Sequence, residues 1–85
     1  MARFKCTSSG AISGVAYIHQ DHDGDWVCSL SSGMRASFFY ALGSCNEMEV
    51  KFALEDARND NERLAILQQA GGKLHKIELM GRAAS

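Results

Sequence analysis

The chain has 85 residues, of which 46% are hydrophobic and 22% charged, and nine basic and ten acidic side chains leave a formal net charge of −1 at pH 7. This composition argues against intrinsic disorder, and the charge balance argues against a molecule-wide field that attracts nucleic acid or an anionic membrane. The length suits one folding unit, so we expect a single α+β domain over residues 1–85.

The cysteines and the N-terminal segment bear on where the protein acts. Cys6, Cys28 and Cys45 stand far apart without a Cys-x-x-Cys pair, which is typical of reduced thiols rather than of a disulfide framework. The N-terminal segment carries basic residues without an apolar run behind them, so we expect no signal peptide. No apolar run approaches the roughly 20 residues that a membrane-spanning helix needs. These features predict a cytoplasmic protein with no membrane partner.

The first predicted elements are strands. Residues 3–7 alternate apolar and polar side chains, which predicts a strand. A β-hairpin follows around Asp23-Gly24, because an Asp-Gly pair between alternating segments favours a two-residue type I′ turn. With this turn, or with a four-residue loop, Tyr17 and Trp26 share the face that packs against the helical part of the chain. The same predicted core face carries Val15, Cys28 and Leu30.

A third strand is predicted over residues 34–42, where apolar and polar side chains alternate after a tight turn at residues 31–33. A short helix is the alternative for this segment. The hydrophobic period then changes to that of a helix. Ser44 and Glu47 fit a capping box, which predicts that a helix begins here.

The helical pattern continues over residues 45–70, with an interruption at residues 59–61, where Asn-Asp-Asn favours caps and turns. Whether this segment is one bent helix or two helices stays open. The glycines at 71–72 are expected to end it, and alternation over residues 74–80 predicts a last strand. The whole pattern predicts a small two-layer α+β domain, in which an antiparallel sheet of three to five strands packs against one bent helix or two short helices.

The segment over residues 17–28, YIHQDHDGDWVC, is rich in groups that bind metals. The spacing of Asp21, Asp23 and Asp25 is similar to the first ligands of a calcium loop. However, the glycine and the final carboxylate of an EF-hand frame are missing. We therefore interpret the segment as a solvated acidic turn.

The same region also contains cysteine and histidine side chains, which are the residue types that bind zinc or act in thiol chemistry. The cysteines with His19, His22 and His75 lack the close ligand pairs of structural zinc sites. Cys28 as a nucleophile, with His19 as base and Asp21 as orienting group, has no evident oxyanion hole. Glycine-rich phosphate loops are absent as well. We predict no catalytic residues, no metal site and no cofactor.

Nucleic-acid binding is the alternative function. If the two terminal strands are neighbours, basic side chains from both gather on one face, and an aromatic side chain can offer a stacking surface. The basic residues are Arg3, Lys5, Lys73, Lys76 and Arg82, and the aromatic one is Tyr40 or Phe39. Because the chain lacks a basic excess, a small nucleic-acid-binding or regulatory domain ranks second.

The main prediction is a non-enzymatic protein-binding module, a stoichiometric inhibitor or adaptor of a larger macromolecular complex. Proteins that phages and other mobile elements use against host defence are often this small, which extends the prediction by analogy of size. The predicted contacts are Asp21, His22, Asp23 and Asp25, whose charges crowd at the hairpin tip without a neighbouring internal cation and favour a basic partner surface. The predicted contacts also include Phe39, because alternation along the predicted strand over residues 34–42 leaves its side chain exposed. The alternative to binding another protein is a homodimer of this chain.

Overall fold

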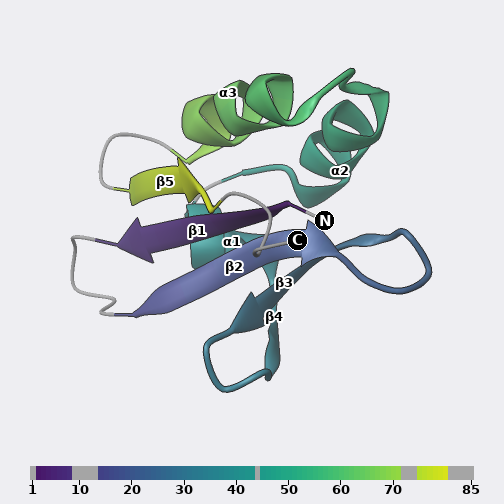
Figure 1. Cartoon of the computed structure of the whole chain (residues 1–85). Coiled ribbons are helices and arrows are strands. Elements are labelled where there is room, and N and C mark those ends of the chain that lie inside the picture. The colour runs from purple at the N-terminus through teal and green to yellow at the C-terminus, as the bar shows by residue number, and fades with distance from the viewer. Residues whose placement is uncertain (1, 9–13, 44, 72–74, 81–85) are drawn as a thin grey trace.

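The computed structural model describes residues 2–8, 14–43, 45–71 and 75–80 (Figure 1). A five-stranded antiparallel sheet with strand order β4-β3-β2-β1-β5 packs against three helices. The predicted α+β fold is confirmed, and the terminal strands β1 and β5 are neighbours. The elements are β1 (Arg3–Ser8), β2 (Val15–Gln20), β3 (Trp26–Leu30), β4 (Arg35–Ala36), α1 (Phe38–Leu42), α2 (Glu47–Asp56), α3 (Asp60–Ala70) and β5 (His75–Leu79).

The β2–β3 hairpin closes with a three-residue loop, residues 22–24, and not with the predicted two-residue turn. The N–H of Asp21 donates to the carbonyl of Asp25 at 2.9 Å, and the N–H of Gly24 donates to the carbonyl of Asp21 at 3.0 Å. Gly24 has a φ of 86°, whereas no described non-glycine residue has a positive φ. A type I′ turn also needs a positive φ at Asp23, so this loop is a type I turn followed by a left-handed glycine.

The odd loop length reverses the predicted face of β2 relative to β3, because side chains alternate with a period of two. Ile18 pairs with Cys28, and both side chains are buried on the helix-facing side together with Trp26. The predicted burial of Trp26 is therefore confirmed. The prediction that Tyr17 and Val15 share that face is wrong, since both lie on the opposite side of the sheet.

The segment predicted as a third strand, residues 34–42, divides into the two-residue strand β4 and the helix α1. The strand prediction is wrong beyond β4, and the helical alternative is correct. Ser37 begins the helix, because its hydroxyl oxygen accepts a hydrogen bond from the N–H of Tyr40 at 3.1 Å. The residues that α1 buries stand at helical spacing: Phe38, Ala41 and Leu42.

The start of α2 differs from the predicted capping box. Asn46 is the N-cap, since its side chain accepts from the N–H of Glu49 at 3.2 Å, while Ser44 lies outside the described residues. The carboxylate of Glu47 accepts instead from the N–H of Phe38 at 2.9 Å. This bond connects the first turn of α2 to the first turn of α1.

The helical segment consists of two helices, which answers the question that the sequence leaves open. Residues 57–59 separate α2 from α3, and Asn59 caps α3 by accepting from the N–H of Glu62 at 2.9 Å. The predicted interruption is therefore confirmed, but it lies at residues 57–59, and Asp60 and Asn61 already belong to α3.

Arg63 fixes the corner between these two helices. Its guanidinium donates to the carbonyl of Leu54 at 3.1 Å and to that of Ala57 at 3.2 Å, both at the C-terminal end of α2. Its Cζ atom lies 5.3 Å from the centre of the Trp26 ring. One α3 side chain thus holds the end of α2 and covers the aromatic ring of β3.

The hydrophobic core lies between one sheet face and the helices, with α1 behind β1 and β2 and the pair α2 and α3 along the upper side in Figure 1. The opposite face, which we name the open sheet face, is covered by no helix in the described part of the chain. Among the described residues, no helix is long and apolar enough to cross a membrane. By alternation, the open sheet face carries Arg3, Lys5, Thr7, Val15, Tyr17, His19, Val27, Ser29, Arg35, Lys76 and Glu78.

Candidate functional site

Asp21, one of the predicted partner contacts, serves the hairpin loop itself. One of its carboxylate oxygens accepts hydrogen bonds from the N–H groups of Asp23 at 2.9 Å and Asp25 at 3.0 Å. Its side chain is only 14% exposed. A carboxylate that closes a loop in this way is a local turn-forming group, so it offers little surface to a partner.

The expectation of an acidic tip without an internal cation is wrong. Arg35 of β4 brings its guanidinium to 3.8 Å from the Asp21 carboxylate. Partial desolvation pushes the pKa of Asp21 upward, but the N–H groups of Asp25 and Asp23, together with nearby His22 and Arg35, outweigh it and hold that pKa below its ordinary value. Asp21 is therefore ionised and compensated within the protein.

The remaining loop residues are open to solvent. The side chains of His22 and Asp23 are 88% and 69% exposed, and their Nε2 and Oδ2 atoms lie 3.5 Å apart. Asp25 is exposed as well. The part of the predicted acidic contact that remains available thus consists of His22, Asp23 and Asp25.

A shallow hollow of about 420 Å³ lies between this hairpin and α2. Met48 and Phe52 stand one helical turn apart on α2 and are 58% and 57% exposed. Both side chains line the hollow, with acidic and basic groups around them. We name this surface the tip groove; its lining residues are Asp21, Asp25, Trp26, Val27, Arg35, Met48, Lys51, Phe52 and Glu55.

The sequence analysis does not identify Met48 and Phe52 as surface residues, because a helical apolar pattern does not show which of its stripes is buried. In the structure α2 buries only Val50 and Leu54. The signal that was available is the width of the apolar pattern: positions 48 and 52 lie at the same i, i+4 spacing as 50 and 54, but on a different stripe. One stripe suffices to dock this helix, which leaves the second exposed.

Phe39 is exposed as predicted, with 63% of its surface open to solvent. It does not line the tip groove, because it projects from α1. The structure therefore does not gather the five predicted partner contacts into one site. The exposure of Phe39 is confirmed, and its contact with a partner stays a prediction.

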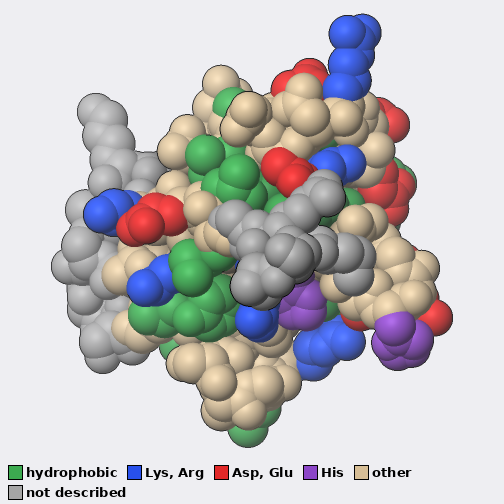
Figure 2. Space-filling view, in the orientation of Figure 1, with side chains coloured by type: hydrophobic (Ala, Val, Ile, Leu, Met, Phe, Trp, Pro, Cys, Tyr) green, Lys and Arg blue, Asp and Glu red, His purple; other side chains and the backbone are tan. Residues whose placement is uncertain are grey.

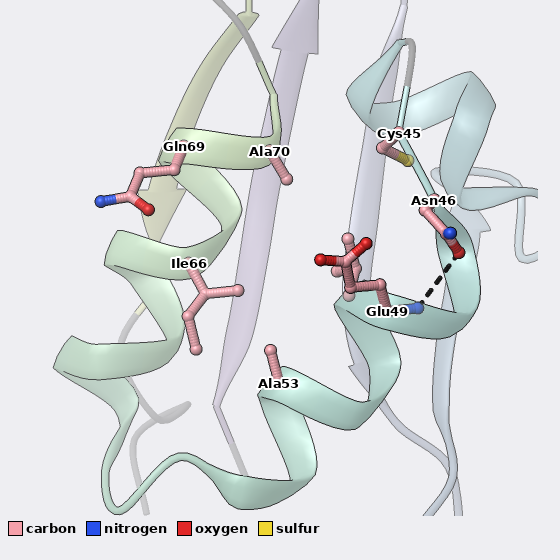
Figure 3. Close-up of a pocket in the computed structure, with 8 residues that line it drawn as sticks. Cys45, Asn46, Glu49, Ala53, Ile66, Gln69 and Ala70 are labelled. Carbon is pink, nitrogen blue, oxygen red and sulfur yellow. Dashed lines mark hydrogen bonds between the residues drawn. The ribbon is translucent and has the colours of Figure 1, made fainter.

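A second hollow of about 370 Å³ separates α2 from α3. Figure 3 shows Ala53 of α2 and Ile66 and Ala70 of α3 around it, with Cys45 at one end. Burial, followed by the charge of Glu47, raises the pKa of the Cys45 thiol above its ordinary value. The hollow is thus lined by apolar groups of both helices and the Cys45 thiol, and also by the polar side chains of Asn46, Glu49 and Gln69.

The cysteine and histidine of the hairpin are not partners. Cys28 is buried on the helix-facing side, whereas His19 lies on the open sheet face. Burial, with a smaller contribution from Glu47, raises the pKa of Cys28 to about 11, so the thiol is protonated at neutral pH. A Cys28–His19 pair is therefore excluded by geometry.

His19 pairs with a serine instead. Its Nε2 lies 3.0 Å from Ser29 Oγ, and its Nδ1 lies 3.1 Å from the carbonyl oxygen of Gln20. Because a carbonyl only accepts, a neutral ring carries its proton on Nδ1 and accepts the Ser29 hydroxyl at Nε2. The pair sits within the regular β2–β3 ladder, whose N–H groups serve the strands, so we interpret it as a satisfied polar contact.

Part of the predicted nucleic-acid surface is formed. Pairing of β1 with β5 brings Lys5 and Lys76 to the same sheet face, with Arg3 beside them. Lys73 and Arg82 lie outside the described residues. Tyr40 and Phe39 belong to α1 on the other side of the sheet. The aromatic side chain beside these cations is therefore Tyr17, which the sequence pattern predicts on the core face.

Besides the hollow between α2 and α3, the described residues present two candidate surfaces, the tip groove and the open sheet face. Within these residues, no cluster of three or more His, Cys, Asp or Glu side chains is arranged to hold a metal ion. Both surfaces are shallow and open, which suits contact with a macromolecule more than enclosure of a small molecule. No protein-family model, curated protein or solved structure matches this chain.

Proposed function

We propose that this chain is a non-enzymatic protein-binding module that uses the tip groove to bind a larger complex as a stoichiometric inhibitor or adaptor. One observation carries the proposal: Met48 and Phe52 are more than half exposed, one turn apart, beside an acidic loop. An apolar centre with a charged rim is the usual anatomy of a protein interface. The proposal includes action in the cytoplasm and, by analogy of size, a phage or mobile-element inhibitor of host defence.

The groove favours a partner that is both apolar and basic. A side chain of the partner inserts between Met48 and Phe52, and its Lys or Arg residues approach the exposed acids Asp23, Asp25 and Glu55. Charge attraction of this kind raises the association rate and weakens as salt rises. The exposed acids therefore raise the speed of encounter, and the apolar pair provides most of the affinity.

The size of a typical interface extends the contact beyond the groove. A stable complex buries about 800 Å² on each partner, which is roughly a seventh of the 5463 Å² accessible surface of this chain. A partner seated in the groove therefore also covers the hairpin loop that forms one wall.

The test is an affinity pull-down from the native host, followed by calorimetric titration of the retained protein. We compare the wild type with a Met48→Ser/Phe52→Ser variant, and use Met34→Ser as the control, since Met34 is 65% exposed but outside the groove. We expect one-to-one binding that the groove variant weakens at least tenfold and the control leaves within twofold.

Three results would redirect the proposal. Equal loss with Met34→Ser, or loss only with Phe39→Ser, would move the interface away from the groove. Concentration-dependent self-association of the chain alone, abolished by the groove variant, would make a second copy the partner and would remove the inhibitor or adaptor role.

A further inference from the structure

The fold separates charges that nearly cancel in the sequence. The segment of α2 and α3, residues 45–71, contains six acidic and three basic side chains. The open sheet face carries four basic side chains and one acidic side chain, Glu78. Figure 2 shows this arrangement from the sheet side, with blue Lys and Arg side chains spread over the sheet and most red acidic ones toward the helices. The basic residues are Arg3, Lys5, Arg35 and Lys76.

Strand register aligns several of these side chains in one row across the whole sheet. The pairs Arg35↔Ser29, Ser29↔Tyr17, Tyr17↔Lys5 and Lys5↔Glu78 are consecutive. Neighbouring strands lie about 4.8 Å apart, so the row spans about 19 Å. An aromatic ring thus lies at the centre of a row with a cation on each side.

The neighbouring residues strengthen this central position. The Arg3 guanidinium lies 4.8 Å from the centre of the Tyr17 ring, so a planar cation stacks beside the aromatic surface. Glu78 is paired with Lys76 at 3.3 Å, which compensates the acid of the row within the sheet. Arg3 and Lys5 remain as cations with no carboxylate partner among the described residues.

We propose that the open sheet face binds single-stranded nucleic acid. Unpaired bases stack on aromatic rings and on Arg planes, and Lys and Arg side chains follow the phosphates. In this arrangement a base stacks at Tyr17 and Arg3, while Lys5 and Arg35 contact phosphates on either side. A duplex hides its base faces, so the central ring favours a single strand. The surface shares Arg35 with the tip groove but includes no residue of α2, so it does not depend on the apolar pair there.

The same chemistry sets the expected strength of binding. Contact with two or three phosphates gives a slope of about −1.4 to −2.1 in a plot of log affinity against log salt, since each contact contributes about −0.7 for a single strand. The dissociation constant is expected at about 10⁻⁴ to 10⁻⁶ M, the range of sequence-independent binding. RNA and DNA share stacking and phosphate contacts, so we expect similar affinities for both.

The test is fluorescence anisotropy of the full chain with labelled 12-nucleotide single strands of RNA and DNA and with the matching duplexes, over 25–200 mM salt. Tyr17→Leu removes the stacking surface and is expected to weaken single-strand binding at least fivefold, while Tyr17→Phe retains it. Lys5→Gln, which removes one phosphate contact, lowers the magnitude of the salt slope by about 0.7. Arg58→Gln, an equal charge loss on the helix side, leaves affinity within twofold.

The following outcomes would overturn the proposal. The first is no anisotropy change with either single strand at 25 mM salt, which would leave an acidic protein surface as the occupant. The second is a duplex that binds as tightly as the single strands. The third is an Arg58→Gln effect as large as that of Lys5→Gln, or full affinity in a folded Tyr17→Leu variant, since either result would mean attraction without this site.

Discussion

Replacing Trp26 with alanine probes the corrected faces of the hairpin. The Trp26 side chain is 3% exposed, its ring centre lies 6.1 Å from that of Phe4, and the Arg63 guanidinium lies 5.3 Å above it. Truncation of a buried aromatic side chain costs about 3 to 5 kcal/mol. A chain of this length has an unfolding free energy of about 4 to 13 kcal/mol. The variant therefore loses a large share of its stability, and its melting temperature falls by at least about 12 °C.

The assay follows unfolding by far-UV circular dichroism in urea and in heat, because Trp26 is the only tryptophan and the variant has no indole fluorescence. Tyr17→Ala is the matched control. Tyr17 lies on the open sheet face, and its contact with Arg3 is worth about 1 kcal/mol or less. A Tyr17→Ala variant that loses as much stability as Trp26→Ala would refute the assignment of faces.

Three further predictions concern the loop and the thiols. Asp21→Ala is expected to lower the urea midpoint because two N–H groups lose their acceptor, while Asp23→Ala leaves it unchanged; equal effects would contradict the loop geometry. In the native state a thiol reagent is expected to modify Cys45 first and to reach buried Cys6 and Cys28 only at the rate of unfolding; three equal rates would count against this burial. Burial, with a smaller contribution from Cys28, raises the pKa of Cys6 from 9.0 to about 12, and burial chiefly raises that of Cys28 to about 11. Since the thiol pKa values in the folded state lie above that in the unfolded state, the unfolding free energy is expected to be constant below about pH 8 and to fall as pH rises above 9. An unfolding free energy of the wild type that does not fall above pH 9 would contradict this prediction. So would an equal fall in a variant with both cysteines replaced by alanine.

Much of the fold could be predicted because its signals are local. Alternation identified β1, β2, β3 and β5, and the Asn-Asp-Asn run marked the break between α2 and α3. The Gly24 conformation was also implied, since its φ of 86° is what an Asp-Gly pair suggests. These features depend on a few adjacent residues, and sequence patterns report them directly.

The faces and the site depend on contacts that the patterns do not contain. The Asp21 carboxylate closes a three-residue loop, and this one extra loop residue places Tyr17 on the open sheet face, where it is half-buried, instead of on the core face. Phe38 enters a helix because Ser37 caps it and Glu47 holds its N–H from nine residues away. Such tertiary choices override the local alternation of the segment.

The candidate surfaces depend on how the fold arranges charged and apolar side chains in space. A net charge of −1 conceals an acidic helical layer and a basic sheet face. Likewise, Met48 and Phe52 become a surface feature only because Val50 and Leu54 suffice to dock α2. Hydrophobic periodicity alone does not state which of two stripes faces the core.

The most direct test of the proposed function is the affinity of the retained partner for the wild type and for the Met48→Ser/Phe52→Ser variant, measured by calorimetry at matched salt. Both side chains are more than half exposed, so the variant is expected to keep the wild-type unfolding free energy to within about 0.5 kcal/mol. We predict a one-to-one complex whose affinity falls at least tenfold in this variant. Unchanged affinity in a variant of unchanged stability would contradict the tip groove as the partner-binding surface.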